Sequence, residues 1–461
     1  DLHTLATNTK DEMARKDAEH NKARAQQAKE HMQTLISKRP KQAHKSIFKK
    51  GGGQGNLTAL LDPTTQQVTT DPKRVTAIVE SHFKESLQSV SIKTGKYLPC
   101  ERPKQDTYPF QKKGAEDSFT LQTPITTSQA PRPWLHSSIQ DKAAFLECLA
   151  SLGSQKAPGP DGVSNELLKS LPPEVLDCIH NLFVIMWATG CTPTQWKNSD
   201  TVLLFKPPKA DSSVPLPIYQ ANICNYRPVG LANTVYKLWT RLVTCTLYEY
   251  AESNTLISTT QAGFRKHRST IDQLQLTVMA LEDARMSHQD IYALIVDFSS
   301  AFNTTSHDKL LWIMYDLGYP TDAIEVVKGL YTQATTQVHT AYGPTSPVPV
   351  ERGTIQGDTL SPFLFLIYME PLLRWLQVGA RGYQPGCVTS EGKDAQLRCT
   401  IGGLAYADDL IILASKISNL LAQAEKLQQY SQWGGLHINF KKSRATGVHY
   451  NKGTLAQLDT S

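Results

Sequence analysis

The chain has 461 residues, of which 40% are hydrophobic and 20% charged, and its formal net charge is +6. This length is enough for one large domain or a few ordinary ones with a sizeable buried core, and the composition excludes a disordered or fibrous protein. The eight cysteines include no Cys-x-x-Cys pair and no Cys/His cluster, which argues against a disulfide framework or a zinc site and favours a reducing compartment. No run of eighteen uninterrupted apolar residues occurs, so no membrane span is expected.

The first segment, residues 1–50, carries the excess of positive charge. It contains twelve Lys or Arg against six Asp or Glu, so the rest of the chain is neutral overall. Residues 9–38 are rich in Ala, Lys, Gln and Glu, which predicts an exposed helix. A basic arm suits a polyanionic partner such as nucleic acid, but a solvated helical tail without a partner fits the same charges. The chain starts at Asp1 without an initiator Met, and we expect it to be an excised piece of a longer polypeptide.

Residues 51–132 are predicted to be a linker region that precedes the main globular body, residues 133–461. The segment opens with GGGQG, a flexible break, and is rich in Pro, Thr, Ser and Lys over residues 91–135. Residues 57–87 between them have the pattern of a hairpin or turn followed by an amphipathic helix.

Two neighbouring patterns in the body predict a strand and a helix. YALIVD, residues 292–297, is a short continuous apolar run, which is typical of a strand buried on both faces. Ser306 is a plausible N-cap for a helix that ends at Gly318, and Pro320 follows as a stop signal.

Two further patterns lie closer to the C-terminus. LSPFLFLIYMEPLLRWL, residues 360–376, predicts a buried helix that starts with Ser361 as its cap and Pro362 at its first position. GLAYADDLIILA, residues 403–414, predicts a strand, a tight turn and a second strand. Strands mixed with packed helices indicate an α+β body.

The carboxylates Asp408 and Asp409 fall at this predicted turn. Adjacent carboxylates between apolar strands are costly to bury, and a hairpin turn or a divalent cation relieves that cost. Asp297 ends another predicted strand, so neighbouring strand ends can bring three carboxylates together. Such a site suits two Mg²⁺ ions and phosphoryl displacement. An Asp-Asp pair taken alone is more often simply a pair of turn residues.

Seven segments, in order over about residues 157–447, carry a resemblance to a known family. The body resembles a reverse transcriptase of the non-LTR (LINE-like) retrotransposon type. The segments are APGPDG (Ala157–Gly162), NYRPVGLANTVYKLWTRLV (Asn225–Val243), QAGFRKHRSTIDQL (Gln261–Leu274), VDFSSAFNTTSH (Val296–His307), GTIQGDTLSP (Gly353–Pro362), YADD (Tyr406–Asp409) and GLHINFKKS (Gly435–Ser443).

This resemblance implies the fingers and palm of a right-hand polymerase, with an antiparallel palm sheet, packed helices and a helical basic N-terminal extension. It also implies RNA-directed DNA synthesis, in which two Mg²⁺ ions, or Mn²⁺ as a substitute, support transfer from a dNTP to a primer 3′-hydroxyl. The metal ligands would be Asp297, Asp408, Asp409 and the backbone carbonyl of Phe298. Lys442 would donate a proton to the leaving pyrophosphate, although a solvated Lys fits its position as well.

The resemblance also implies a set of contacts with the incoming nucleotide. Phe302, in the Ala301–Phe302 pair, would lie under the sugar and exclude a 2′-hydroxyl, with a plain core aromatic as the alternative. Gln356 and Gly357 would shape the pocket over the nascent base pair. Arg265 and Arg268 have forked donors that suit triphosphate oxygens, with an ordinary surface Arg as the alternative for either and more so for Arg268.

Two departures from the family pattern bear on activity. Ser300 and Asn303 stand where the family commonly has Lys and Asp, and the chain ends at Ser461, before the expected helical thumb. A catalytically inactive, nucleic-acid-binding relic is therefore the alternative function. An RNA-dependent RNA polymerase shares the palm arrangement, but the Ala301–Phe302 pair and YADD favour the reverse transcriptase.

The expected partners are an RNA template, a DNA primer or target, and dNTPs, without a membrane. We expect an endonuclease and a thumb on the rest of the parent polypeptide. The family also implies an intracellular ribonucleoprotein of the nucleus and cytoplasm, which acts in target-primed reverse transcription.

Overall fold

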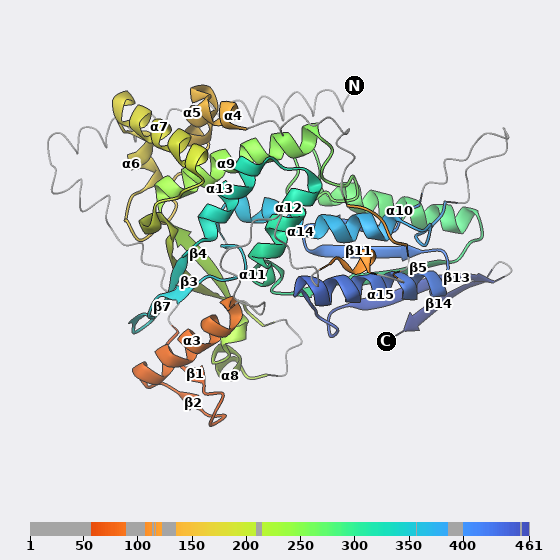
Figure 1. The fold of residues 1–461 in the computed structure, drawn as a ribbon. Coiled ribbons are helices and arrows are strands. Elements are labelled where there is room, and N and C mark those ends of the chain that lie inside the picture. Colours follow the sequence, from red (N-terminus) through yellow and green to blue (C-terminus); the bar gives the residue numbers. More distant parts are fainter. Residues whose placement is uncertain are drawn as a thin grey trace, which may run out of the picture.

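A computed structural model describes most of the body of the chain. The described residues are 57–88, 107–112, 115, 117–121, 135–208, 214–355, 357–385, 400–451 and 454–460. The basic arm predicted over residues 1–50 lies outside them. The fold mixes helices with antiparallel and mixed sheets (Figure 1), and the expected α+β body is confirmed at this level.

The first main sheet is antiparallel and has the strand order β10-β11-β5-β13-β14. Its strands are β5 (Ile291–Val296), β10 (Gly403–Tyr406), β11 (Asp409–Ala414), β13 (Arg444–Asn451) and β14 (Thr454–Thr460). Strand β5 therefore lies at the centre, between β11 and β13, with Leu410 opposite Val296 on one side and Arg444 opposite Ile295 on the other. Helix α15 (Ile417–Gly434) packs against β5 and β11.

The strand predicted over residues 292–297 is present as β5, but its burial differs from the prediction. Ile295 is 45% exposed, and Ala293 and Leu294 are only half-buried. The expectation of burial on both faces was therefore wrong. A continuous apolar run is typical of parallel strands covered by helices on both faces, whereas both neighbours of β5 are antiparallel, and one face of an antiparallel sheet can meet solvent.

The strand–turn–strand prediction for residues 403–414 is confirmed by β10 and β11. Tyr406 pairs with Asp409, which leaves Ala407 and Asp408 as a two-residue hairpin loop. Ala407 has a left-handed backbone with φ +58°. The pairing places the Asp408 side chain at the loop and Asp409 at the first position of β11.

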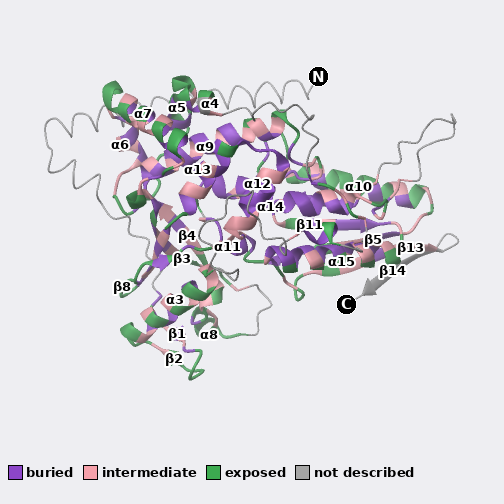
Figure 2. Ribbon diagram, viewed as in Figure 1, coloured by how far each residue is buried: buried purple, intermediate pink, exposed green. Residues whose placement is uncertain are grey.

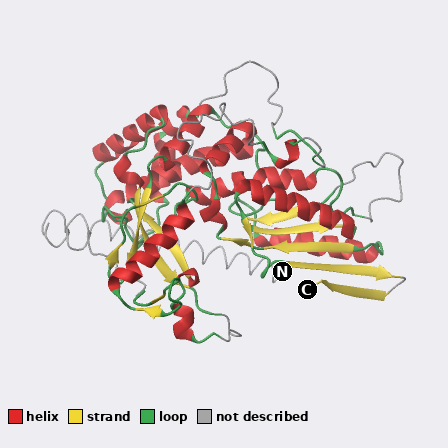
Figure 3. Ribbon diagram, turned by 60° about the horizontal axis from the view of Figure 1, so that its bottom comes forward, coloured by secondary structure: helices red, strands yellow, loops and turns green. Residues whose placement is uncertain are grey.

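The second main sheet lies apart from the first, as Figure 3 shows. Its strands are β3 (Asn198–Phe205), β4 (Tyr226–Ala232), β7 (Thr335–Thr340), β8 (Gly343–Pro344) and β9 (Val348–Pro349). Strand β3 pairs antiparallel with β4 and parallel with β7, so this sheet is mixed. The short strands β6 (Phe298–Ser299) and β12 (His437–Ile438) form a separate antiparallel pair.

The predicted hairpin and amphipathic helix of residues 57–87 are present as β1 (Leu60–Leu61), β2 (Val68–Thr69) and α3 (Pro72–Leu87). The carboxylate of Asp71 caps α3 by accepting from the N–H of Arg74. Buried side chains of α3, including Val79 and Phe83, share a hydrophobic cluster with Leu203 of β3 and Val338 of β7. The apolar stripe of α3 therefore lies against the second sheet.

The C-terminal end of α3 is also tied to the body by one arginine. The guanidinium of Arg352 donates to the backbone carbonyls of Glu85 (3.1 Å) and Ser86 (2.8 Å), and the N–H of Arg352 donates to the carbonyl of Leu87 at 3.1 Å. These bonds satisfy carbonyls that the helix end leaves unpaired.

Helix α14 (Leu360–Gln377) is the buried helix predicted from its apolar run. Fifteen of its eighteen residues are buried, and burying each large apolar side chain contributes about 1.5–3 kcal/mol, so α14 is a main element of the core (Figure 2). Its predicted start was slightly wrong, because the N-cap position is Thr359. Ser361 lies inside the helix and donates its hydroxyl to the carbonyl of Ile355.

Helix α12 (His307–Leu317) confirms the prediction of a helix between Ser306 and Gly318. Ser306 is its N-cap, and Gly318 ends it with a left-handed φ of +95°. Among the described residues, no helix is long and apolar enough to cross a membrane. The remaining helices are α4 (His136–Gln140), α5 (Lys142–Ala150), α6 (Asn165–Lys169), α7 (Pro173–Thr189), α8 (Leu216–Gln220), α9 (Thr234–Ser253), α10 (Thr270–Met286), α11 (Ala301–Thr304) and α13 (Thr321–Tyr331).

Candidate active site

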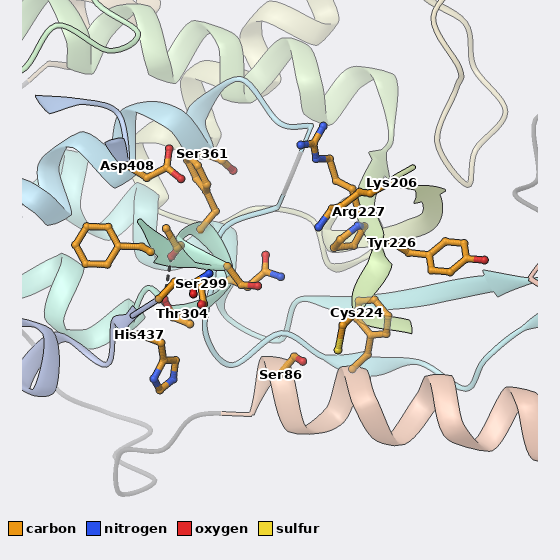
Figure 4. A pocket seen from close by; sticks show the side chains of 18 of the residues that line it. Ser86, Lys206, Cys224, Tyr226, Arg227, Ser299, Thr304, Ser361, Asp408 and His437 are labelled. Carbon is orange, nitrogen blue, oxygen red and sulfur yellow. Dashed lines mark hydrogen bonds between the residues drawn. The ribbon is translucent and has the colours of Figure 1, made fainter. Parts of the chain in front are cut away.

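A cleft of ≈1010 Å³ lies between the two sheets, and it is lined by residues of α3, of β3 and β4, of the loop between β10 and β11, and of the segments 297–304, 352–362 and 437–442. Figure 4 shows Asp408 on one side of it, with Lys206 and Arg227 across from the acidic side. The lining residues that bear on chemistry are His82, Ser86, Lys206, Tyr226, Arg227, Asp297, Phe298, Ala301, Phe302, Arg352, Gly357, Asp408, Asn439 and Lys442. The cleft therefore has carboxylates on one wall and cationic side chains on another.

The acidic wall is built by the ends of β5 and β10. Asp297 directly follows β5, and Asp408 sits in the loop between β10 and β11. Because Leu410 pairs with Val296, the next positions of these two strands are Asp409 and Asp297. Burial raises the pKa of Asp408, and the negative charges of Asp409 and Asp297 raise it further. Three carboxylates thus repel one another here, and a cation bound between them would relieve that repulsion.

The backbone around Asp297 is fixed by the segment that follows β12. The carbonyl of Asp297 accepts from the N–H of Asn439 at 2.8 Å, and the N–H of Asp297 donates to the hydroxyl of Ser443 at 3.1 Å. This segment also brings the ammonium of Lys442 to 3.7 Å from Oδ2 of Asp297. The Lys442 side chain is 63% exposed, so it lies at the mouth of the cleft.

The cationic wall comes from the second sheet. Lys206 directly follows β3, and Arg227 lies in β4, opposite Leu204 of β3. Burial lowers the pKa of Lys206, and the positive charges of Arg227 and Lys442 lower it further. Like charges held this close favour an anionic ligand, because an anion would offset their mutual repulsion.

The floor between these walls contains Ala301, Phe302 and Gly357. The Phe302 ring is packed against Phe365 of α14 with 4.7 Å between ring centroids. Gly357 has φ +109°, and a Cβ there would lie 2.8 Å from the carbonyl oxygen of Gly230 in β4, so only glycine fits. Gly357, which was predicted to shape the pocket, lines the cleft.

The residues predicted from the sequence fall into four groups, the last of which is a pair of arginines. Seven of them line one cleft, namely Asp297, Phe298, Ala301, Phe302, Gly357, Asp408 and Lys442. Asp409, the residue after Asp408 and the first of β11, does not line the cleft. Gln356 lies outside the described residues.

The two arginines predicted to contact a triphosphate are not brought to the cleft. Arg265 is buried, and its guanidinium donates to both carboxylate oxygens of Glu252 at 2.8 Å and to the carbonyls of Ser258 and Gln261. These four bonds tie the loop after α9 together, so Arg265 serves the fold in this structure. Arg268 is exposed and does not line the cleft.

Sequence reasoning missed Lys206 and Arg227 as candidate anion ligands. Arg227 stands inside the NYRPV segment, so the motif itself contained the signal. Lys206 gave no local signal, because its position depends on the pairing of β3 with β4. His82 and Ser86 were missed for a similar reason, since α3 was assigned to a linker.

The donor chemistry of the acidic wall suits a hard divalent cation. Carboxylate oxygens are the ligands that Mg²⁺ prefers, and one or two of them with substrate phosphates complete a typical site. Within the described part of the chain, no group of three or more His, Cys, Asp or Glu side chains is close enough to form a metal site by itself. A cation would therefore need oxygen atoms from its substrate as well as those of Asp297 and Asp408.

Comparison with known proteins agrees with this fold and cleft. Residues 208–451, more than half of the chain, match the family model described as reverse transcriptase (RNA-dependent DNA polymerase). The chain therefore belongs to the reverse transcriptase family. Enzymes of this family use divalent metal ions, which accords with the acidic wall.

Three proteins that are similar to the chain come from transposable elements. The chain is similar to a probable RNA-directed DNA polymerase from transposon BS of Drosophila melanogaster, with 26% identity over 55% of this chain and 26% of the relative. It is likewise 26% identical to a Pol polyprotein of the type-1 element R2 of Nasonia vitripennis, over 62% of this chain and 25% of the relative. The RNA-directed DNA polymerase of the Drosophila melanogaster mobile element jockey is 26% identical over 64% of this chain and 30% of the relative.

By name, these relatives are proteins of transposable elements, and the similarity supports the expected resemblance to a non-LTR reverse transcriptase. The chain spans about a quarter to a third of the length of these relatives.

Proposed function

We propose that this chain catalyses RNA-directed DNA synthesis, in which a nucleotide is transferred from a dNTP to a primer 3′-hydroxyl. The observation that carries this proposal is the cleft itself. Asp297 and Asp408 line its acidic wall, and Lys206 and Arg227 line its cationic wall. Nucleotidyl transfer needs both features, since the reacting α-phosphate requires charge stabilisation and the triphosphate requires cationic ligands.

The two sheets correspond, in this proposal, to two parts of a right-hand polymerase. The antiparallel sheet around β5 would be the palm, which bears the reacting groups, and the mixed sheet around β3 would belong to the fingers, which hold the nucleotide. Residues 133–461 would form these parts, preceded by the basic arm of residues 1–50 and by residues 51–132. The packing of α3 against β3 and β7 supports including residues 57–88 in the working unit.

The proposed cofactor is a pair of Mg²⁺ ions, with Mn²⁺ as a substitute. Asp297, Asp408, Asp409 and the backbone carbonyl of Phe298 would hold them, together with phosphate oxygens. When bound, such ions lower the pKa of the primer hydroxyl and neutralise charge on the triphosphate. Burial first, and then the negative charges of Asp409 and Asp297, raise the pKa of Asp408, and a cation held among these carboxylates would offset their repulsion.

Each step of the proposed nucleotidyl transfer can be assigned to groups that line the cleft or to solvent. In this proposal the primer 3′-oxygen forms a bond to the α-phosphorus and gives its proton to solvent water, while the bond from that phosphorus to the pyrophosphate oxygen breaks. Lys442, at the mouth of the cleft, would give a proton to the departing pyrophosphate. Lys206 and Arg227 would bind the β- and γ-phosphates, and Phe302 would pack under the deoxyribose, where a 2′-hydroxyl has no room.

The proposed partners are an RNA template, a DNA primer or target, and dNTPs, as target-primed reverse transcription requires. The parent polypeptide would supply an endonuclease and a thumb, and the complex would be an intracellular ribonucleoprotein of the nucleus and cytoplasm. The polyprotein named among the relatives is consistent with additional domains on the parent chain.

Primer extension on an RNA template tests the proposal. The purified chain should extend a DNA primer in the presence of Mg²⁺ and dNTPs, and Asp408→Asn should abolish extension. Full activity in Asp408→Asn would contradict it. Salt-sensitive RNA binding by a wild-type chain that never extends a primer would instead favour the inactive, nucleic-acid-binding relic.

A further inference from the structure

Gln261 makes an unusual set of hydrogen bonds behind the acidic wall. Its side chain is fully buried, and its amide contacts both polar groups of the Ala407 backbone. The Nε2 group donates to the carbonyl of Ala407 at 3.2 Å, and Oε1 accepts from the N–H of Ala407 at 2.9 Å. The same Oε1 accepts from the N–H of Gly263 at 2.8 Å. One side chain thus forms a two-point clamp on the residue that precedes Asp408.

The hairpin loop needs outside support because of the residue at its first position. Two-residue hairpins of the favoured types place that residue at positive φ, where glycine is preferred and other residues are strained. Here the position is Ala407, with φ +58°. An L-residue held in that region is strained and persists only when surrounding contacts determine its conformation.

The backbone beside Gln261 adds to the clamp. The N–H of Ala262 donates to the carbonyl of Ala405, and the N–H of Ala405 donates to the carbonyl of Thr260, both at 2.9 Å. Residues 260–263 therefore run along the outer edge of β10. A Cβ at Gly263 would lie 2.1 Å from the nitrogen of Ala407, so this approach requires glycine. The Gln-Ala-Gly sequence is thus matched to the loop in both hydrogen bonding and shape.

We infer that Gln261 is a positioning residue that fixes the Asp408 carboxylate by clamping the Ala407 peptide in its left-handed conformation. It does not line the cleft and so acts only through the loop. The inference rests on the proposed polymerase function for its effect on rate, whereas hydrogen exchange tests the clamp itself without any activity.

Two substitutions separate the clamp from simple packing. Gln261→Met keeps the length of the side chain but removes every hydrogen bond, and Gln261→Glu keeps an acceptor for both N–H groups while losing the donor. In Gln261→Met, the rate of single-nucleotide incorporation should fall at least ~10-fold, as for a misplaced reacting group, while the KM for dNTP stays within about 3-fold. Exchange of the Ala407 amide should accelerate at least ~10-fold in Gln261→Met and stay slow in Gln261→Glu.

Gln423→Met is the matched control, because Gln423 is equally buried and its Nε2 donates to the carbonyl of Leu376, away from the cleft. Rates are compared per folded molecule, with the folded fraction taken from thermal unfolding. A protected Ala407 amide in Gln261→Met, or equal losses of rate in Gln261→Met and Gln423→Met, would overturn the inference. If the wild-type chain lacks polymerase activity, the proposed function fails, and the exchange of Ala407 in the two Met variants alone decides whether the clamp exists.

Discussion

The ammonium nitrogen of Lys442 lies 3.7 Å from Oδ2 of Asp297, at the edge of the acidic wall. The backbone sets this distance, since Asn439 and Ser443 hydrogen-bond to the backbone of Asp297 on either side of Lys442 in sequence. An ion pair with a 63% exposed lysine contributes little to stability. Lys442 is therefore expected to contribute little to folding, which is compatible with its proposed role as a proton donor.

Replacing Lys442 by Gln should lower the rate of nucleotide incorporation by about 100-fold without lowering the melting temperature. A positioned general acid contributes about 100- to 10,000-fold to rate, and the exposed side chain contributes little to the fold. Single-turnover incorporation of one dNTP measures the rate. Lys441→Gln is the matched control, because it removes the same charge from the adjacent exposed position, and equal losses in both variants would refute the assignment of Lys442.

Arg227→Gln should raise the KM for dNTP by about 10-fold or more, because a charge-assisted hydrogen bond is worth roughly 1.5–3 kcal/mol. Arg268→Gln should leave the KM unchanged, since Arg268 does not line the cleft. Steady-state incorporation over a range of dNTP concentrations distinguishes the two. A larger rise in KM for Arg268→Gln than for Arg227→Gln would contradict this assignment and support Arg268 as the triphosphate contact.

Phe302→Ala should increase incorporation of ribonucleotides relative to deoxyribonucleotides. The Phe302 ring lines the cleft and is packed against Phe365, so its removal opens space beneath the sugar. The measurement is the ratio of rates with rNTP and dNTP on one template, and a rise of about 10-fold or more is expected from relieving a steric clash. Phe440→Ala, at an 80% exposed ring that does not line the cleft, should not change the ratio. An unchanged ratio in Phe302→Ala would mean that the ring is only a packing residue.

His307 should make the stability of the fold depend on pH. Its Nε2 lies 2.7 Å from the carbonyl of Gly353, and its ring stacks on Tyr331. Burial lowers the pKa of His307 to about 4, below its usual value of 6.5. Between about pH 4 and pH 6.5 the unfolded chain therefore binds more protons than the folded chain. The contribution of neutral His307 to the free energy of unfolding is full above about pH 6.5 and is lost as the pH falls towards 4.

The size of this effect is on the order of 3 kcal/mol of unfolding free energy between pH 7 and pH 4. Denaturant unfolding at several pH values measures it. His307→Gln keeps a donor for Gly353 but does not titrate, so its stability should fall less steeply over the same range. Identical pH profiles for the wild type and His307→Gln would contradict the assignment.

Elements whose structure depends on local sequence patterns were predicted correctly. The apolar run of α14, the helix between Ser306 and Gly318, and the YADD hairpin were all predicted from short patterns with caps or turns. Asp297 and Asp408 were predicted to converge because neighbouring strand ends can bring carboxylates together. Their convergence follows from the pairing of β5 with β11.

Contacts between segments that are distant in the sequence were not predicted. Arg265 forms its salt bridge with Glu252, thirteen residues earlier, because the chain turns back after α9. Lys206 reaches the cleft only through the second sheet, and no local pattern indicates which strands pair there. The exposure of Ile295 was not predicted for the same reason, because the apolar sequence of β5 does not indicate whether the adjacent strands run parallel or antiparallel to it.

The most direct test of the whole account is extension of a DNA primer on an RNA template, in Mg²⁺, by the wild type and by Asp408→Asn. Asp141→Asn serves as the control, because Asp141 only caps α5 and asparagine caps a helix equally well. The account predicts template-directed extension by the wild type and Asp141→Asn and none by Asp408→Asn. Extension by Asp408→Asn at the wild-type rate, or its absence from the folded wild-type chain, would contradict it.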